Sequence, residues 1–290
     1  MSNTTVVSSG RSGLASYLNP LHLLANVWTR RDLIGQLIWR GVQSRYRGSS
    51  LGLVWAFILP FLMLSVYTFA FSVVLRGGKG AAPGVDTPVQ FALWLFCGLI
   101  PFQLFAECLT QSPLLVVSNP SYVKKVVFPL EVLPVVLLGT AAVNGLIGLG
   151  ILLTAVLISS QGLSPYIWAL PLAALPLGMF SLGVGWLLAS LGVYLRDIGQ
   201  LATILSQMLM FITPIFYSLA MVPSELAQNI LRINPLTAVV ENARRMIIPA
   251  PEQVAPDWGW LAVMIVVSAV VMQLGYAFFM KTKRGFADVL

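Results

Sequence analysis

Charged residues are scarce in this sequence. Only 9% of its 290 residues are Asp, Glu, Lys or Arg, and 58% are hydrophobic. A water-soluble domain carries about 25% charged residues, so the deficit predicts a membrane protein instead. The few charges give a net charge of +7 at pH 7. We attribute this excess to membrane topology and to contact with anionic lipid, and we expect no nucleic-acid partner.

Cysteine and histidine are almost absent, which leaves little material for metal or covalent chemistry. Cys97 and Cys108 lie eleven positions apart in one apolar region, a spacing that gives neither a disulfide framework nor a metal motif. The single histidine, His22, lies outside the apolar runs, where an interfacial or solvated side chain is the ordinary interpretation. We therefore predict no catalytic residue, no metal site and no cofactor in this chain.

Long uncharged runs predict six membrane-spanning helices. Residues 52–75 contain no charge, and these 24 residues suffice to cross a hydrocarbon core of about 30 Å. The 64 residues from 132 to 195 are also uncharged, so they must fold back, and "SSQGLSP" at 159–165 is the turn. The runs show no alternation of period two, which excludes a barrel. The predicted spans are 52–75, 89–112, 126–159, 166–194, 198–219 and 258–280.

The expected fold is an all-α membrane protein in which both termini lie in the cytoplasm. With six spans, the segments on the terminal side hold twelve Lys and Arg residues against five on the other side, and the richer side faces the cytoplasm. We divide the chain into a flexible N-terminus (1–27), an amphipathic helix with a hinge (28–50), the six-helix domain (51–280) and a cytoplasmic tail (281–290).

Residues 28–47, "WTRRDLIGQLIWRGVQSRYR", predict an interfacial helix. Apolar residues at helical spacing share one face, and arginines and glutamines occupy much of the remainder. The segment ends in "RGSSLG", where Gly48 and Gly52 allow a turn into the first span. Arg45, Arg47 and the backbone at 49–50 either hold a phosphate there or anchor the helix to lipid headgroups. From the residues alone, both interpretations stay open.

The segment between the fifth and sixth spans predicts two short re-entrant or interfacial helices. Asn234-Pro235 divides it, and each half carries apolar residues at helical spacing. Arg244 and Arg245 face either an outer pore mouth or the outer lipid headgroups.

The chain contains no motif that would power transport. No G-x-x-x-x-G-K-S/T loop occurs, and no ionisable residue lies in the middle of a predicted span. Glu107 and Glu131 lie near span ends, where they are interfacial or paired with Lys124, Lys125 or a neighbouring helix. We therefore expect a partner protein to supply the energy.

Several motifs resemble one known family. They are "RDLIGQLIWRGVQSRYRGSSLGLVWAFILP", "SNPSYVKKVVFPLEVLP", "YLRDIGQL", "TPIFYS" and "NPLTAVVENARRMI", in this order over about residues 30–285. They are similar to the membrane subunit of ABC-2-type polysaccharide exporters of the bacterial cytoplasmic membrane. Such exporters move capsular polysaccharide, O-antigen or teichoic acid, and here the resemblance puts capsule first and O-antigen next. A small-molecule or lipid exporter of the same fold is the alternative.

The resemblance also implies partners and sites. Two copies of the permease would pair with two copies of an ABC ATPase that binds ATP and Mg, and a lipid-linked polysaccharide would enter at the lead-in helix. Periplasmic or outer-membrane polysaccharide export proteins are candidate further partners. The implied entrance residues are Arg45, Tyr46, Arg47, Ser49 and Ser50. The implied contacts with the ATPase are Ser121, Tyr122, Lys124, Lys125, Arg196 and Asp197.

A long sugar polymer must thread through a lined conduit, because no pocket can enclose it. Sugar rings stack their C–H faces on aromatic rings, so aromatic side chains suit such a lining. Spans one and five supply the candidates, and for each of them helix packing or lipid contact is the alternative. The candidates are Phe57, Phe61, Tyr67, Phe211, Phe216 and Tyr217.

Overall fold

A computed structural model describes residues 20–47, 51–70, 85, 87–124, 128–159, 162–249 and 254–289, and in these ranges it contains helices and no strands. Four helices are long and apolar enough to cross a membrane: α5 (Pro88–Gln111), α7 (Val132–Ile158), α8 (Leu170–Tyr194) and α12 (Trp258–Thr282). They confirm the second, third, fourth and sixth predicted spans as apolar helices.

The helices described for the first and fifth predicted spans are shorter than the other four. α4 (Trp55–Phe69) and α9 (Ile198–Ile212) have 15 residues each, about 22 Å at 1.5 Å per residue. Residues 71–75 of the first predicted span lie outside the described part of the chain. The fifth span was predicted to reach residue 219, but the helix ends at Ile212. Thr213 is extended there (ψ 133°) because it precedes Pro214, whose ring disfavours a helical conformation at the residue before it.

The third predicted span also begins later than expected, at Val132 in place of residue 126. Residues 128–131 form a turn, in which the Val132 amide donates to the Pro129 carbonyl at 3.0 Å. Pro129 lacks an amide hydrogen and favours such a turn ahead of a helix. Glu131 consequently lies at the start of α7, outside the long apolar helix.

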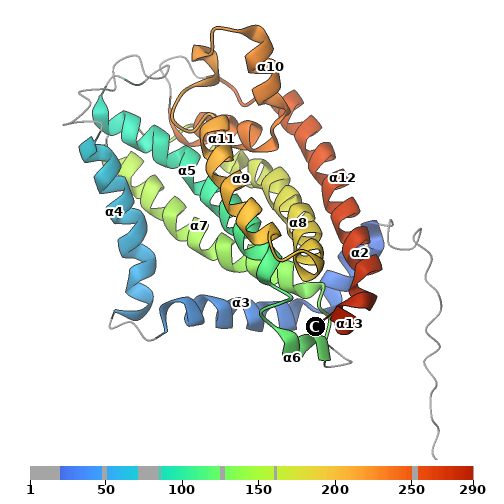
Figure 1. The fold of residues 1–290 in the computed structure, drawn as a ribbon. Coiled ribbons are helices and arrows are strands. Elements are labelled where there is room, and N and C mark those ends of the chain that lie inside the picture. Colours follow the sequence, from blue (N-terminus) through green and yellow to red (C-terminus); the bar gives the residue numbers. More distant parts are fainter. Residues whose placement is uncertain are drawn as a thin grey trace, which may run out of the picture.

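A set of short elements lies across one end of the helix bundle (Figure 1). It consists of α2 (Pro20–Thr29), α3 (Arg31–Tyr46), α6 (Pro120–Lys124) and α13 (Phe286–Val289). We call this end the α3 side. The sequence predicted a flexible segment up to residue 27, yet residues 20–27 belong to α2, because Leu23 is buried in an apolar cluster with Val116 and Phe286. Residues 1–19 lie outside the described ranges.

α3 packs tightly on α7. The apolar face of α3, which the sequence predicted, is turned toward the rest of the protein. Ile34 and Val42 are buried on this face. The close approach depends on small residues, since a Cβ on Gly139 would lie 2.2 Å from Ile38, and one on Gly41 would lie 2.8 Å from Thr140. In Figure 1, α3 runs crosswise to α4.

The opposite end of the bundle, which we call the α10 side, carries α10 (Glu225–Ile233) and α11 (Pro235–Ile247). These are the two short helices that the sequence predicted on either side of Asn234-Pro235. α10 buries no residue, whereas α11 is mostly buried. The two helices therefore differ in how they are placed, one lying on the surface and the other within the protein.

Arg244 of α11 is buried, so the sequence-based interpretation of it as a contact of lipid headgroups is wrong. It lines a cavity on the α10 side together with Glu241 and Arg245, and a place at a pore mouth stays a prediction. Its guanidinium donates to the carbonyls of Pro214 and Ile215 at 2.7 Å each, and it lies over the Trp94 ring. Gly98 leaves room for it, since a Cβ there would lie 2.8 Å from Nη2. Arg244 thus ties α11 to α5 and to the segment that follows α9.

Candidate substrate entrance

The junction of α3 and α4 brings two predicted entrance residues to the α3 side of the bundle. Arg45 lies in the last turn of α3, and Arg47 follows the helix and is exposed. Gly52 has φ +52°, a conformation that glycine adopts without steric cost, which confirms it as part of the predicted turn. Gly48, Ser49, Ser50 and the side chain of Tyr46 lie outside the described part of the chain.

Arg45 forms a two-pronged ion pair with Glu107 of α5. Its Nη1 donates to Oε2 at 3.1 Å, and its Nη2 donates to Oε1. Both side chains are partly buried, with exposed fractions of 31% and 18%. A planar guanidinium matches a carboxylate in this way, and it would match a phosphate in the same way. Of the alternatives for Glu107, the structure selects pairing with a neighbouring helix.

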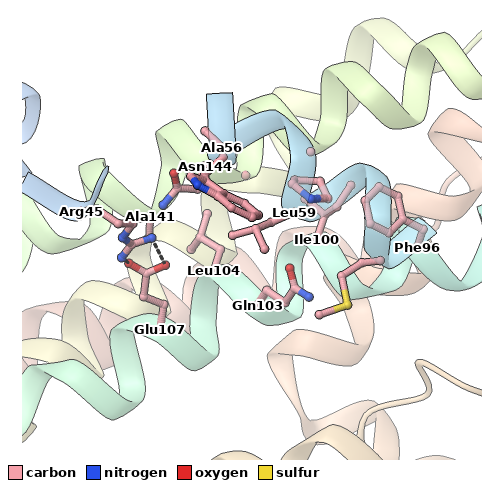
Figure 2. Close-up of a pocket in the computed structure, with 15 residues that line it drawn as sticks. Arg45, Ala56, Leu59, Phe96, Ile100, Gln103, Leu104, Glu107, Ala141 and Asn144 are labelled. Carbon is pink, nitrogen blue, oxygen red and sulfur yellow. Dashed lines mark hydrogen bonds and ion pairs between the residues drawn. The ribbon is translucent and has the colours of Figure 1, made fainter. Parts of the chain in front are cut away.

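A cavity of about 470 Å³ extends from this ion pair into the bundle, between α4, α5 and α7 (Figure 2). Each helix lines it with residues at helical spacing, so each contributes one stripe of its surface. Beside Arg45, the lining residues are Trp55, Ala56, Leu59, Pro60 and Met63 of α4, Phe96, Ile100, Gln103, Leu104 and Glu107 of α5, and Ala141, Asn144, Gly145 and Gly148 of α7.

The polarity of the lining changes along the cavity. Figure 2 shows Arg45 and Glu107 together at one end, with Leu59, Ile100 and Phe96 toward the other. Gln103 lies one helical turn from Glu107 along α5. The cavity therefore has a charged mouth on the α3 side and an apolar interior. The sequence analysis did not predict this cavity, although Phe96, Ile100, Gln103 and Glu107 recur at helical spacing in the sequence.

A second charged cluster on the α3 side centres on Glu131. Its carboxylate accepts from Lys283 Nζ at 2.6 Å, from Arg30 Nη1 and from Asn26 Nδ2 at 3.3 Å, and its carbonyl accepts from Trp186 Nε1 at 3.0 Å. Burial by itself would raise the pKa of Glu131, but the Lys283 ammonium and the hydrogen bonds outweigh burial and lower the pKa. The cluster joins α2, α7, α8 and the end of α12.

The amino-acid sequence matches a known transporter family. The ABC-2 type transporter family matches residues 32–248 of this chain, which is most of its length. The chain belongs to the ABC-2 type transporter family. It is a multi-pass membrane protein, and members of this family have no nucleotide-binding site.

Among proteins of this family, O-antigen export permeases are similar to the chain over nearly their whole length. The O-antigen export system permease protein RfbA of Klebsiella pneumoniae is 27% identical over 263 residues, covering 89% of this chain and 95% of that protein. The protein of the same name from Myxococcus xanthus is 26% identical over 269 residues, covering 92% of this chain and 99% of that protein.

The candidate ATPase contacts of this ABC-2 permease lie on one side, the α3 side. α6 carries Ser121, which is exposed, and Tyr122, whose ring stacks on Phe128 at 4.2 Å. Arg196 and Asp197 are exposed in the turn between α8 and α9. α13 contacts both α6 and α8 and so connects the two places. The side chain of Lys124 and all of Lys125 lie outside the described residues, and the contact itself stays a prediction.

The aromatic candidates of the permease divide into two groups. Phe57, Phe61 and Phe211 expose 56%, 61% and 68% of their surface in the single chain. The other three, Tyr67, Phe216 and Tyr217, are half-buried. Phe211 and Phe216 stack at 5.9 Å, and the Tyr217 hydroxyl donates to the carbonyl of Ile212 at 3.1 Å. These contacts orient Phe211, Phe216 and Tyr217. A role of the six side chains in lining a channel stays a prediction.

Proposed function

We propose that this ABC-2 permease is the channel-forming subunit of an ATP-driven exporter that moves a lipid-linked polysaccharide from the cytoplasm across the inner membrane. The observation that carries the proposal is the similarity to O-antigen export permeases over about nine tenths of the chain. These relatives favour O-antigen over the capsular polysaccharide that the sequence resemblance put first.

The proposal places the α3 side in the cytoplasm. α2, α13, α6 and the α8–α9 turn would then lie there together, as six membrane crossings require. Exposed apolar side chains on α4 and α9, such as Phe61 and Met208, support membrane or protein contact along both shorter helices. A second copy of the chain would complete the conduit, with the aromatic candidates along it.

ATP hydrolysis belongs, in this proposal, to a separate ABC ATPase present in two copies. α6 and the Arg196–Asp197 turn are proposed as its contacts. The Glu131 cluster supports this assignment, because it joins the start of α7 to α2 and to the end of α12. α6 packs through Tyr122 and Val123 on the neighbouring apolar cluster, which includes residues of α2, α7 and α12. A displacement of α6 would therefore be transmitted to these helices.

The phosphate of the lipid anchor would bind at the α3–α4 junction. Arg45 and Arg47 supply two positive charges there, against the single negative charge of Glu107. The exposed position of Arg47 and the partly exposed pair leave donors within reach of the membrane interface. Such charge-assisted hydrogen bonds to phosphate are stronger than neutral ones.

The decisive experiment is depletion of the protein followed by mass spectrometry of the lipids that accumulate. We expect a lipid carrying the polysaccharide to build up on the cytoplasmic side, and its sugars to identify the cargo. Accumulation of a small molecule or of an unglycosylated lipid, with normal surface polysaccharide, would contradict the proposal and favour the alternative exporter class.

A further inference from the structure

We propose that the cavity between α4, α5 and α7 binds the hydrocarbon chain of the cargo's lipid anchor, with the anchor's phosphate on Arg45. This inference rests on the proposed function, because it names the place that the anchor of that cargo occupies. The site lies within one protomer. None of the six aromatic candidates is among the residues that line it.

The dimensions of the cavity suit a hydrocarbon chain. Its α5 wall runs from Phe96 to Glu107, which is about 17 Å at 1.5 Å per residue and so about half of a hydrocarbon core of about 30 Å. The volume of about 470 Å³ along this wall leaves room for such a chain.

The order of polar and apolar groups along the cavity is that of an anionic lipid. The charged groups Arg45 and Glu107 lie at the mouth, Gln103 and Asn144 line the wall, and the far end is apolar, with Phe96 and Ile100. A lipid that enters from the α3 side therefore places its phosphate on the arginines and its chain beside apolar side chains. The apolar wall takes the place of the surrounding lipid, so the chain stays out of water while the headgroup is transferred.

Glu107 acts as a positioning residue for Arg45. While the site is empty, its carboxylate holds the guanidinium fork at the mouth. A phosphate accepts hydrogen bonds from the same donors and therefore competes with Glu107, whose like charge also repels it. Glu107 thus weakens anchor binding while it keeps Arg45 in place, which suits a substrate that must leave again.

The first test fills the cavity. Membranes containing the complete exporter are photolabelled with an isoprenyl phosphate that carries a diazirine in its chain, and the labelled peptides are identified by mass spectrometry. Gly148→Leu fills the cavity from α7, where a Cβ would meet only Ile100, at 3.6 Å. Met63→Trp fills it from α4. We expect each to lower labelling of the lining residues about tenfold.

Matched controls carry the same substitutions outside the cavity. Gly150→Leu changes a glycine of α7 with no atom within 4 Å of its Cβ position, and Leu62→Trp changes an exposed neighbour on α4. Labelling should remain at the wild-type level in both. Wild-type labelling in Gly148→Leu and Met63→Trp, or equal loss in the controls, would overturn the proposal.

The second test concerns the mouth, where two substitutions should act in opposite directions. Arg45→Ala removes the phosphate ligand and should lower labelling about tenfold. Glu107→Gln keeps an acceptor for Arg45 but removes the competing charge, and should raise labelling about threefold. A purely structural ion pair would lower labelling in both variants, and that result would remove Glu107 from its proposed role.

A third comparison separates this inference from the proposed function. A diazirine-bearing phosphatidylglycerol should label the lining residues less than the isoprenyl phosphate does, and the reverse order would make the cavity a resident-phospholipid site. Wild-type polysaccharide export by Gly148→Leu, despite lost labelling, would also overturn the inference while leaving the proposed function intact. The proposed function fails separately, if depletion causes no lipid-linked polysaccharide to accumulate.

Discussion

Arg45 shows how a residue far away in sequence can hold a side chain in place. It lies 62 residues from Glu107 in sequence, and their ion pair fixes the end of α3 against α5. Arg244 shows the same on the α10 side, where three carbonyls and one carboxylate accept hydrogen bonds from its guanidinium. A buried charge is tolerated only when its donors are satisfied, and Arg244 meets this condition, whereas Arg45 stays partly exposed.

Replacing Arg45 and Arg47 together by alanine should lower polysaccharide export about tenfold, because hydrogen bonds to a charged phosphate are lost. Export is measured as polysaccharide on the cell surface, and membrane insertion as protein recovered with the membrane fraction. Arg31→Ala with Arg40→Ala is the matched control, since it removes the same charge from α3 at residues that do not line the cavity. Full export by the Arg45, Arg47 variant would contradict phosphate binding at the entrance.

Glu131 predicts a pH dependence of stability. Because its pKa is lowered in the folded protein, its pairing with Lys283 and Arg30 contributes stability at neutral pH. This contribution is lost as the pH falls through the lowered pKa. Thermal unfolding of the purified permease in detergent should therefore move to lower temperature in acid. Glu131→Gln should lower stability at pH 7 by about 1–3 kcal/mol. It should also make the unfolding temperature depend less on pH in acid, and an unchanged pH dependence would contradict the assignment.

At the scale of helices, small residues determine how closely neighbours approach. α8 and α12 make the most extensive contact between any two elements of the described chain, and Gly183 and Gly275 lie where they touch. Without a hydrophobic driving force in lipid, such close packing is a main source of helix association. α3 and α7 use Gly41 and Gly139 in the same way.

Gly275→Ala should destabilise the α8–α12 pair. Its Cβ would lie 2.1 Å from the Gly183 carbonyl oxygen, which is backbone and cannot rotate away. We expect a loss of about 1–3 kcal/mol, as for other overpacked sites, seen as a lower unfolding temperature in detergent. Gly150→Ala, which meets no atom within 4 Å, should keep the wild-type temperature. Equal temperatures for both variants would argue against tight packing here.

At the scale of the molecule, most basic residues of the described elements lie on one side. α3, α6, the α8–α9 turn and the end of α12 belong to the α3 side and carry Arg31, Arg40, Arg45, Lys124, Arg196 and Lys281, whereas α10 and α11 on the other side carry Arg232, Arg244 and Arg245 (Figure 1). The asymmetry gives the permease one end suited to an ATPase and to anionic lipid. Arg45 and Glu107, at the charged end of the entrance cavity, lie on that same side.

The topology can be tested by cysteine labelling, because both native cysteines are buried. Ser121→Cys, on exposed α6, should react with a membrane-impermeant maleimide only in opened cells. Glu225→Cys, on exposed α10, should react from the outside. Labelling of Ser121→Cys from the outside would reverse the orientation and remove the proposed cytoplasmic entrance.

Sequence patterns predicted the elements better than their ends or their contacts. The amphipathic face of α3 was predicted correctly, and so were the break at Asn234-Pro235 and the turn at Gly52, because each depends on a few neighbouring residues. The end of α9 at Ile212 was missed although Pro214 signals it locally. The buried position of Arg244 and its hydrogen bonds were also not predicted, because the acceptors of these bonds lie in α5 and after α9.

The sequence by itself determined that this protein lies in a membrane and that it is helical. Uncharged runs of this length must satisfy their backbone hydrogen bonds within each helix when they lie in lipid. Only the tertiary structure decided which charges pair and where a cavity remains between helices. Glu107 and Glu131 had several possible partners along the chain, and the packing of α3 on α7 and of α12 on α8 selected among them. Such choices depend on contacts between residues far apart in sequence, which no local pattern records.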